Sequence, residues 1–338
     1  MKAVILHDRI DDQSRPDVAD ALVQADLVTA ALTSAGYEVA LLPVDANLAA
    51  LQEALTAQAP DVAINLVESL NGVARLGHVV PALLEVLGIP FTGTGSAALQ
   101  ITTSKLLTKC WLERCGIPTP SCFVPQRPSA QMETPSIAPG KFIIKPVWED
   151  ASVGIDDQAV VAVNDRHDLD LALDRAAACF GEVFAEEFIE GREFNLAIYA
   201  GAKGPVLLPP AEIEFVDFPA EKPHIVGYAA KWDETAFEYH ATPRRFGFPA
   251  TDDGLLQNLR DLALQCWHAF QLHGYARVDF RVDCDNRPFV LEVNANPCIS
   301  PDAGFMAAVQ YAGLQAAEVV MEFVRDALSR STRKAVIC

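Results

Sequence analysis

The sequence has few basic residues and no long apolar run, and each deficit excludes a class of protein. Its 338 residues hold 26 Lys and Arg against 45 Asp and Glu, a formal net charge of −19. A general DNA or RNA coat needs a basic face, so we expect no nucleic-acid partner. No apolar stretch approaches the roughly 20 residues that cross a bilayer, so we expect no membrane partner either.

The cysteines form no Cys-x-x-Cys pair, and the N-terminus has no secretory pattern. A chain with 338 residues and 8 cysteines does not need disulfides as staples, because it can bury a core of ordinary size. The first residues, MKAVILHD, contain one basic residue and a short apolar run, which is too short for a signal peptide. We therefore expect a cytoplasmic protein whose thiols are reduced and mostly buried.

No Gly-x-Gly-x-x-Gly motif follows the first expected strand, which argues against a dinucleotide site there. Instead, short apolar strands alternate with amphipathic helices over the first part of the chain. Strands separated by crossover helices predict a parallel sheet covered on both faces. The expected strands are 3–6, 37–42, 62–66 and 89–91, and the expected helices are 18–35, 48–58 and 79–87.

The rest of the chain mixes strands and helices in a different order. One helical stretch ends at Cys115, and a proline-rich surface connection is expected at 125–140. Two strands at 183–188 and 193–199 are separated by a short turn, which predicts a hairpin. The remaining expectations are strands at 141–147, 160–163, 275–282 and 288–293, and helices at 169–180, 255–273 and 306–329.

The most informative polar residues lie on the last two expected strands. Alternation along a strand places Arg277 and Asp279 on one face, and it places Glu292 and Asn294 together on the next strand. If the two strands are antiparallel neighbours, three oxygen ligands and a guanidinium converge. Oxygen ligands without His or Cys suit Mg²⁺, and the arginine suits phosphate, as phosphoryl transfer requires. The alternative is a solvated hairpin face, which the apolar neighbours of Glu292 and the following Pro297 disfavour.

Two weaker clusters precede that pair. Lys145 ends an apolar strand, where a buried ammonium needs an anionic partner. The small-residue loop at 149–155 could lay its backbone N–H groups on a phosphate. Glu186 and Glu193 flank a turn and could bind an adenine amino group and ribose hydroxyls. Solvated turns and acidic hairpins share these features, so neither cluster decides the function by itself.

Taken in order, these clusters resemble the ATP-grasp superfamily, and within it the D-alanine–D-alanine ligase branch. The resemblance runs from about Asn65 to Gly313 and rests on the shared order and spacing of short segments. The matching segments are 80–85, 88–93, 104–109, 116–120, 145–154, 186–193, 231–232 and 277–294.

The resemblance implies an α/β fold with three parts and ATP held between the last two. A Rossmann-like N-terminal domain would span 1–94, and a central ATP-grasp subdomain with the phosphate lid would span 95–184. A C-terminal ATP-grasp subdomain with the metal and catalytic residues would span 185–330, followed by a tail at 331–338. The implied cofactors are ATP and Mg²⁺, or Mn²⁺ in its place.

The resemblance also implies roles for individual residues. The nucleotide contacts would be Lys105, Lys145, Ser152, Glu186, Glu187, Ile189, Glu193 and Lys231. The metal ligands would be Asp279, Glu292 and Asn294, and the catalytic residues would be Arg277, Ser152 and Lys231. The implied reaction phosphorylates a carboxylate with the γ-phosphoryl group of ATP, which supplies a leaving group, and an amine then attacks.

The sequence departs from this branch where the amino-acid substrates bind. The branch's glycine-rich N-terminal turn and its glutamate have no counterpart at 7–14. The first lid serine is Ala151, the tyrosine after the phosphate lysine is Trp232, and a family glycine is Cys298. We therefore expect a carboxylate and an amine other than two D-alanines.

The substrate contacts expected from these departures are Glu68, Asn71, Arg75, Trp232, Cys298, Ser300 and Asp302. Glu68 or Asp302 could pair with a substrate ammonium, although each could equally be structural. Cys298 is interpreted as a small side chain at a tight turn, because no His that could act as a base lies near it in the sequence. The expected partners are a small-molecule carboxylate and amine, and a homodimer stays open.

Three functions stay open at this point. The first is a carboxylate–amine ligase, and the second is an ATP-grasp enzyme that uses a non-amine acceptor or stops at phosphorylation. The third is a non-catalytic ATP-binding regulator. The presence of both Arg277 and the metal set favours an enzyme, because a pure binder does not need groups that stabilise a reaction intermediate.

Overall fold

The fold is described by a computed structural model that covers residues 1–10, 15–125 and 137–337, with the side chains of 331–337 left out. Most of the proline-rich connection predicted at 125–140 lies outside the described residues, and so does the second half of the segment at 7–14. Within the described part, no helix is long and apolar enough to span a bilayer.

The N-terminal part is a three-stranded parallel sheet in the order β2-β1-β3. The alternation seen in the sequence is confirmed, and six consecutive residues of β1 are buried because helices cover both faces. The elements are β1 (Lys2–Asp8), α1 (Pro16–Ser34), β2 (Glu38–Val44), α2 (Leu48–Gln58), β3 (Val62–Asn65) and α3 (Val79–Leu87). The strand predicted at 89–91 is only a bridge between Phe91 and Ala63.

Two helices, not one, follow this sheet. The predicted helical stretch is broken at Ser104, whose ψ of 105° is extended, into α4 (Ser96–Thr103) and α5 (Lys105–Arg114). The Ser104 hydroxyl accepts a hydrogen bond from the backbone N–H of Leu107 and so caps α5. The break places Lys105 at the first position of a helix that borders the site.

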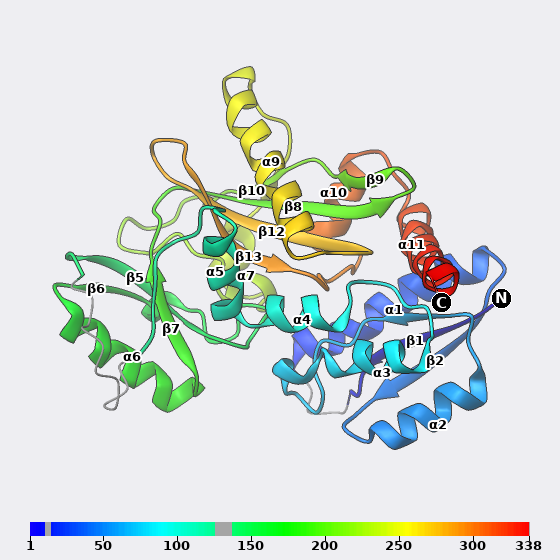
Figure 1. Cartoon of the computed structure of the whole chain (residues 1–338). Coiled ribbons are helices and arrows are strands. Elements are labelled where there is room, and N and C mark those ends of the chain that lie inside the picture. Colours follow the sequence, from blue (N-terminus) through cyan, green and yellow to red (C-terminus); the bar gives the residue numbers. More distant parts are fainter. Residues whose placement is uncertain (11–14, 126–136, 338) are drawn as a thin grey trace.

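The central part is a four-stranded antiparallel sheet in the order β4-β7-β5-β6, with α6 packed on it (Figure 1). Asp165 begins α6 as an N-cap, because its carboxylate accepts from the backbone N–H of Asp168. The elements are β4 (Cys122–Phe123), β5 (Gly140–Pro146), β6 (Val160–Val163), α6 (Arg166–Phe180) and β7 (Val183–Glu187).

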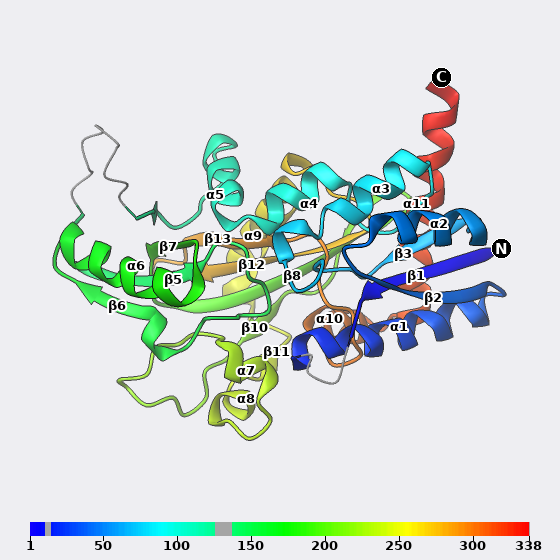
Figure 2. The same cartoon turned by 90° about the horizontal axis from the view of Figure 1, so that it is seen from below.

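The C-terminal part is built on a six-stranded antiparallel sheet in the order β11-β10-β8-β12-β13, with β9 paired to β8. Its strands are β8 (Arg192–Gly201), β9 (Gly204–Leu207), β10 (Ala211–Ile213), β11 (Arg244–Arg245), β12 (Tyr275–Val282) and β13 (Pro288–Asn294). Its first helices are α7 (Tyr228–Trp232), α8 (Phe237–Ala241) and α9 (Asp253–Ala269). Figures 1 and 2 show α9 on one side of the sheet and α7 and α8 on the other. Short 3-10 helices occur at Ala74–Leu76, Asp157–Ala159 and Ala250–Asp252.

The hairpin predicted for 183–199 is wrong, because β7 and β8 belong to different sheets. The connection runs from the central sheet to the large sheet and needs a glycine at position 191. Gly191 has φ +144°, and a Cβ there would lie 2.0 Å from the carbonyl oxygen of Val282. What looks like a local turn in the sequence is therefore a link between two subdomains.

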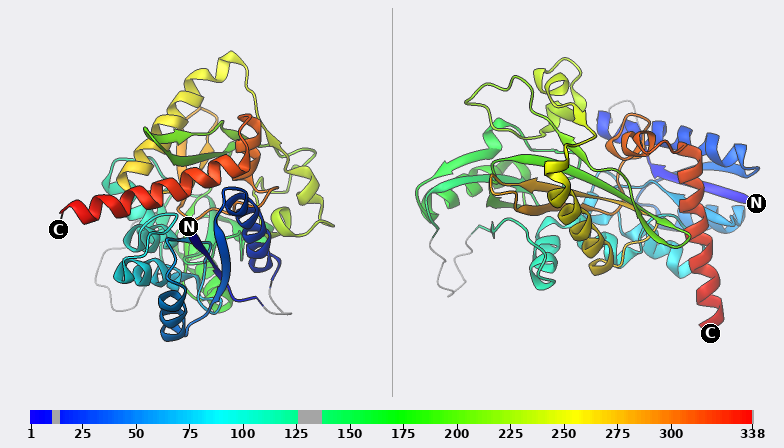
Figure 3. Two further views of the ribbon diagram at one scale, coloured as in Figure 1. Left: turned by 90° about the vertical axis from the view of Figure 1, so that its right-hand side faces the viewer. Right: turned by 90° about the horizontal axis from the view of Figure 1, so that it is seen from above.

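The single C-terminal helix predicted from the sequence is two helices. Gly313, with φ +73°, separates α10 (Gly304–Tyr311) from α11 (Ala316–Ile337). The predicted tail is helical as far as Ile337, because no Gly or Pro interrupts that segment. Figure 3 shows α11 running between the large sheet and the N-terminal part, where it contacts both α1 and β8.

The cysteines differ from the prediction that most are buried. Of the seven whose surroundings are described, only Cys266 is buried, and Cys110, Cys115, Cys179 and Cys284 are exposed. All seven are free thiols, as predicted. The four exposed cysteines lie at solvent-facing positions of helices and turns. The apolar character of the thiol was therefore not enough to predict burial.

A cluster of aromatic rings joins α11 to the large sheet and offers a stability test. Phe323 is 2% exposed and stacks on Tyr275 with ring centroids 4.3 Å apart. We expect Phe323→Ala to lower the free energy of unfolding by about 3–5 kcal/mol, because it leaves a cavity that the surroundings only partly fill. Val86→Ala, at a side chain 83% exposed, is the control and should change it by less than about 0.5 kcal/mol. Chemical denaturation measures both, and an unchanged midpoint for Phe323→Ala would contradict the packing.

Candidate active site

A cavity of about 490 Å³ lies where the three parts of the chain meet. Its walls come from α1 and the residues after β3, from the central sheet with its loop at 149–155, and from the large sheet with α7. One face of the large sheet packs in the core against α9, and the other face lines the cavity. Ala276, Val278 and Phe280 belong to the core with α9, whereas Arg277, Asp279 and Arg281 line the cavity, as alternation along a strand requires.

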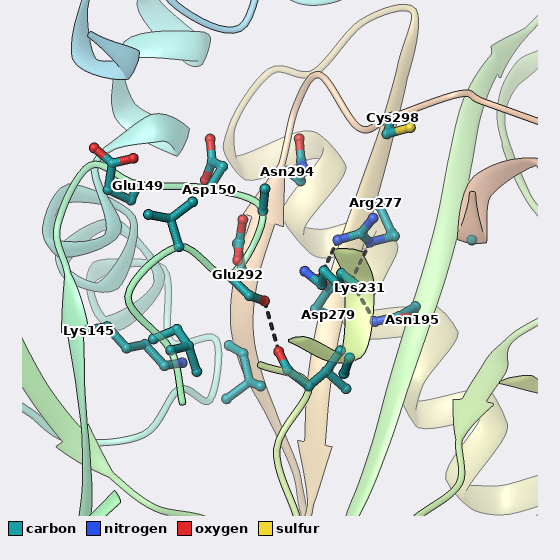
Figure 4. Close-up of a pocket in the computed structure, with 18 of the residues that line it drawn as sticks. Lys145, Glu149, Asp150, Asn195, Lys231, Arg277, Asp279, Glu292, Asn294 and Cys298 are labelled. Carbon is teal, nitrogen blue, oxygen red and sulfur yellow. Dashed lines mark hydrogen bonds and ion pairs between the residues drawn. The ribbon is translucent and has the colours of Figure 1, made fainter. Parts of the chain in front are cut away.

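The predicted pairing of the last two strands is confirmed. β12 and β13 are antiparallel neighbours, with Arg277 opposite Asn294 and Asp279 opposite Glu292. The Arg277 guanidinium forms a bidentate ion pair with Asp279, at 2.7 Å from Nε to Oδ1 and 2.8 Å from Nη2 to Oδ2 (Figure 4). Asn195 on β8 donates a further hydrogen bond to Asp279 at 2.8 Å. Burial disfavours the charge on Arg277, but Asp279 outweighs it and raises the pKa of the guanidinium.

Glu292 is held ionised by the cations around it. Burial alone would raise the pKa of its carboxyl, but Lys105, Lys231 and Arg277 together lower it. Asn294, two residues further on, turns its Oδ1 to the backbone N–H of Asn296 at 3.0 Å and keeps a second lone pair. An ionised carboxylate and an amide oxygen on neighbouring positions are oxygen donors of the kind Mg²⁺ prefers.

These donors fit Mg²⁺ only as a shared site. Among the described residues, no group of three or more His, Cys, Asp or Glu side chains is close enough to hold a metal ion. Mg²⁺ is usually bound through one or two carboxylates together with substrate phosphates, so a protein cage is not needed. Asp279, Glu292 and Asn294 therefore fit an ion that arrives with a nucleotide.

At the other end of the cavity, a buried carboxylate is shared by two lysines. Glu186 on β7 is 1% exposed, and its oxygens pair with Lys145 and, at 2.5 Å, with Lys109. Burial would raise the pKa of Glu186, but the two ammonium groups lower it. The sequence predicted Lys145 and Glu186 here but assigned no role to Lys109, which also donates to Thr119 at 2.8 Å.

The loop at 149–155 closes over the cavity and contacts α7. Ser152 donates to the carbonyl of Val226 at 2.8 Å, and Trp232 donates to the carbonyl of Ala151 at 3.1 Å. Ala151 and Ser152 both have positive φ, which is uncommon for residues with a Cβ and marks a constrained loop. The loop predicted as a phosphate lid is therefore built as a strained turn fastened to the opposite wall.

Lys105 faces this loop across the cavity. Its ammonium binds the carbonyl oxygen of Glu149 and lies 3.3 Å from Oδ1 of Asp150. Burial raises the pKa of Asp150 to about 6, against the lowering effect of Lys105. Lys231 on α7 also lines the cavity, and burial and the nearby Arg277 lower its pKa. No carboxylate of the described chain forms an ion pair with Lys231, so it is available to an anion.

The substrate candidates divide into two groups. Glu68, Trp232, Cys298 and Asp302 line the cavity, together with the predicted nucleotide contacts Glu187, Ile189 and Glu193. The structure does not bring Asn71, Arg75 or Ser300 to the cavity wall. Asn71 accepts from the backbone N–H of Ala46, Arg75 is exposed, and Ser300 donates to both carboxylate oxygens of Asp20 at 2.7 Å.

Cys298 also forms a hydrogen bond with Asp20. The thiol donates to Oδ2 of Asp20 at 2.9 Å, and burial raises the pKa of the thiol. A thiol that stays protonated is a poor nucleophile. This agrees with the interpretation of Cys298 as a small side chain at a turn.

Several residues of the cavity wall were not predicted. They include Asp17, Asp20, Asn195, Arg244 and Arg281, whereas Glu149 and Asp150 belong to the predicted loop at 149–155. Arg281 could have been found, because it continues the alternation of Arg277 and Asp279 along β12. Nothing in the sequence indicates that Asp17 and Asp20, on the first helix, meet residues more than two hundred positions away.

Comparison with known proteins agrees with this geometry. The family described as "D-ala D-ala ligase C-terminus" matches residues 126–325. A D-alanine–D-alanine ligase of Marinomonas sp. is 30% identical over 93% of this chain and 92% of its own length. An uncharacterised protein, y4sG, of Sinorhizobium fredii is 29% identical over 86% of this chain and 82% of its own length.

Solved structures show the same fold over the whole chain. The crystal structure of a D-alanine–D-alanine ligase from Bacillus anthracis complexed with ATP covers 99% of this chain and 99% of its own, with a TM-score of 0.73 and 20% identity. The sequence match and the site together lead to one conclusion: the chain is an ATP-grasp ligase and belongs to the D-alanine–D-alanine ligase family.

Proposed function

We propose that this protein joins a carboxylate to an amine at the expense of ATP, with amino acids or amino-acid-like molecules as substrates. One observation carries the proposal. A guanidinium, oxygen donors and three lysines converge on one cavity, and the far end of this cavity holds the buried Glu186 carboxylate, which would bind the base. This set neutralises the charge that develops when a phosphoryl group moves to a carboxylate.

The nucleotide would lie between the central and large sheets. Glu186, with the backbone near Ile189, would bind the adenine, and Glu193 would bind the ribose. Lys105, Lys145 and Lys231 would bind the phosphates, with Ser152 in the loop above them. The Lys105 ammonium has three N–H donors and uses two of them on the Glu149 carbonyl and on Asp150, so one donor is left for a phosphate.

Asp279, Glu292 and Asn294 would hold Mg²⁺. When bound, the ion would supply charge neutralisation and polarise the transferring phosphoryl group. Arg277 lies beside them on β12, where its guanidinium can stabilise the acyl phosphate and the tetrahedral intermediate. Its bidentate contact with Asp279 holds the planar group in one orientation. The side chain therefore loses little conformational entropy when it binds the intermediate.

Two charged side chains in the cavity, Glu68 and Arg244, could form ion pairs with substrates. Glu68 has no hydrogen bond or ion pair from its side chain within the described residues. Desolvation of its carboxyl in the cavity, together with the nearby carboxylates of Asp8 and Asp150, raises the pKa of Glu68 well above the usual value. A substrate ammonium would relieve this repulsion. Among the described residues the Arg244 guanidinium makes one hydrogen bond, from Nη1 to the carbonyl of Asp302 at 3.0 Å, so its other N–H groups can receive a carboxylate. A molecule with both charges, such as an amino acid, suits these two groups.

We propose substrates that differ from two D-alanines. Ala151 and Trp232 occupy positions where the branch has a serine and a tyrosine. The indole N–H of Trp232 donates a hydrogen bond to the Ala151 carbonyl. The cavity wall near Cys298 is also changed, since its thiol is tied to Asp20. We also propose a cytoplasmic location, where ATP and Mg²⁺ are available. Whether the protein forms a homodimer is left open.

The first experiment measures phosphate release from Mg-ATP with pooled D- and L-amino acids. We expect at least one pool to stimulate release and to yield a condensed product in mass spectrometry. Release without a condensed product would indicate another acceptor. Binding of Mg-ATP with no release in any pool would indicate a nucleotide sensor and would overturn the proposal.

Removing one oxygen donor tests the metal site. We expect Glu292→Ala to lower turnover by about 10²-fold or more, because several kcal/mol of charge stabilisation are lost. The thermal midpoint should stay nearly unchanged, since the side chain fills no core volume. Glu190→Gln, at an exposed carboxylate outside the cavity, is the matched control. Normal turnover of Glu292→Ala in a phosphate-release assay would refute the assignment.

Closure over the nucleotide is tested by hydrogen exchange. The loop at 149–155 and the segment 217–245 are joined by the bonds of Ser152 and Trp232. We expect saturating Mg-ATP to slow exchange in both segments, because lids over phosphates order when the ligand binds. The buried strand β1 should not change. Equal exchange with and without nucleotide in the two segments would contradict a lid.

A further inference from the structure

Arg281 is a buried cation to which the proposed chemistry assigns no role. It lies on β12 two residues beyond Asp279, on the face of the sheet that lines the cavity, and it is only 4% exposed. Burying a guanidinium is expensive unless every part of it has a partner. An apolar side chain would stabilise this position more simply, so the contacts of Arg281 indicate what it does.

The guanidinium joins three segments that meet at the base-binding end of the cavity. Nη1 donates to the carbonyl of Gly191, in the link between the two subdomains, at 3.1 Å. Nη2 donates to the carbonyl of His224 and lies 3.1 Å from Oε2 of Glu193. The planar group also lies over the rings of Phe188 and Phe215, with its central carbon 5.5 Å and 5.4 Å from their centroids.

The contact with Glu193 is built into the sheet. Arg281 and Glu193 are directly opposite each other on the neighbouring strands β12 and β8. Nη2 of Arg281 lies 3.1 Å from Oε2 of the carboxylate, and no described residue donates a hydrogen bond to Oε1, which can therefore accept from a ligand. Gly191, two residues earlier, is held by the same guanidinium and cannot shift without breaking that bond.

We propose that Arg281 is a positioning residue that fixes Glu193 and the link at 188–191, and thereby makes the site selective for a nucleotide with ribose hydroxyls. The inference rests on the proposed nucleotide site but not on the ligase reaction. Arg281 does not touch the hydroxyls. It holds the carboxylate that does, so one fixed oxygen meets the sugar instead of a mobile side chain.

The test compares the binding of Mg-ATP with that of Mg-2′,3′-dideoxy-ATP by calorimetry, without any acceptor. The wild-type protein should prefer ATP by about tenfold or more, because hydroxyls bound to a charged acceptor contribute strongly to affinity. Arg281→Met should weaken ATP about tenfold and change the dideoxy nucleotide less than about twofold, so the preference disappears. Arg281→Lys should keep part of it, since an ammonium can pair with Glu193 but cannot bridge all three segments.

A matched control separates this role from simple stabilisation. Arg192 on β8 is also partly buried, stacks on Phe194 and pairs with Glu212 and Asp252, but it does not line the cavity. Arg192→Met should leave the preference for ATP unchanged. Glu193→Gln should remove the preference, and the double variant Arg281→Met with Glu193→Gln should lose no more, because both changes act on one contact.

The outcomes are distinct. Equal weakening of both nucleotides by Arg281→Met, or an unchanged preference, would show a general structural role and overturn the inference. If Arg281→Met does not fold, Arg281→Lys decides the question, and a wild-type preference in that variant overturns it as well. Failure of the wild-type protein to bind Mg-ATP would refute the proposed function itself, which these arms distinguish from the role of Arg281.

Discussion

The site depends on the register between β8, β12 and β13. This register sets Asp279 opposite Glu292 on one side and opposite Asn195 on the other, and it sets Arg281 opposite Glu193. A slip of one residue would turn these charged side chains into the core against α9 and expose the apolar ones. The hydrophobic packing of Val278 and its neighbours on α9 therefore also fixes the position of every polar group on the other face.

Pairing makes this density of charge tolerable. Glu186 is shared by two lysines, and Arg277 and Asp279 form a bidentate pair, so the burial of each charge is offset by an opposite one. Lys231 and Glu68 have no such partner among the described residues, and they lie where phosphate and substrate are proposed to bind. An unpaired charge of this kind is directly available to a ligand, whereas a paired one such as Lys145 or Asp279 has to share its partner with the ligand.

Contacts between distant segments complete the cavity. Asp20 on α1 binds the Cys298 thiol and the Ser300 hydroxyl, which joins the first helix to the turn after β13. α11 packs against both α1 and β8 and so holds the N-terminal part against the large sheet. Cys298, one of the positions that differ from the family pattern, therefore takes part in this joint and also lines the cavity.

Strongly periodic segments were predictable from sequence. The bounds of α2, α3, β6 and β12 agree with the patterns, and the order of the motifs indicated the family. The roles of the individual nucleotide and metal residues stay predictions. Local patterns cannot show which strands pair, so they predicted a hairpin where β7 and β8 enter different sheets, and they merged α10 with α11. They also could not separate Glu68, in the cavity, from Asn71 and Arg75 outside it. The sequence by itself determined the chemistry available, because residue types and spacing are local. Only the tertiary structure decided which of those groups meet, because that depends on packing between segments far apart in the chain.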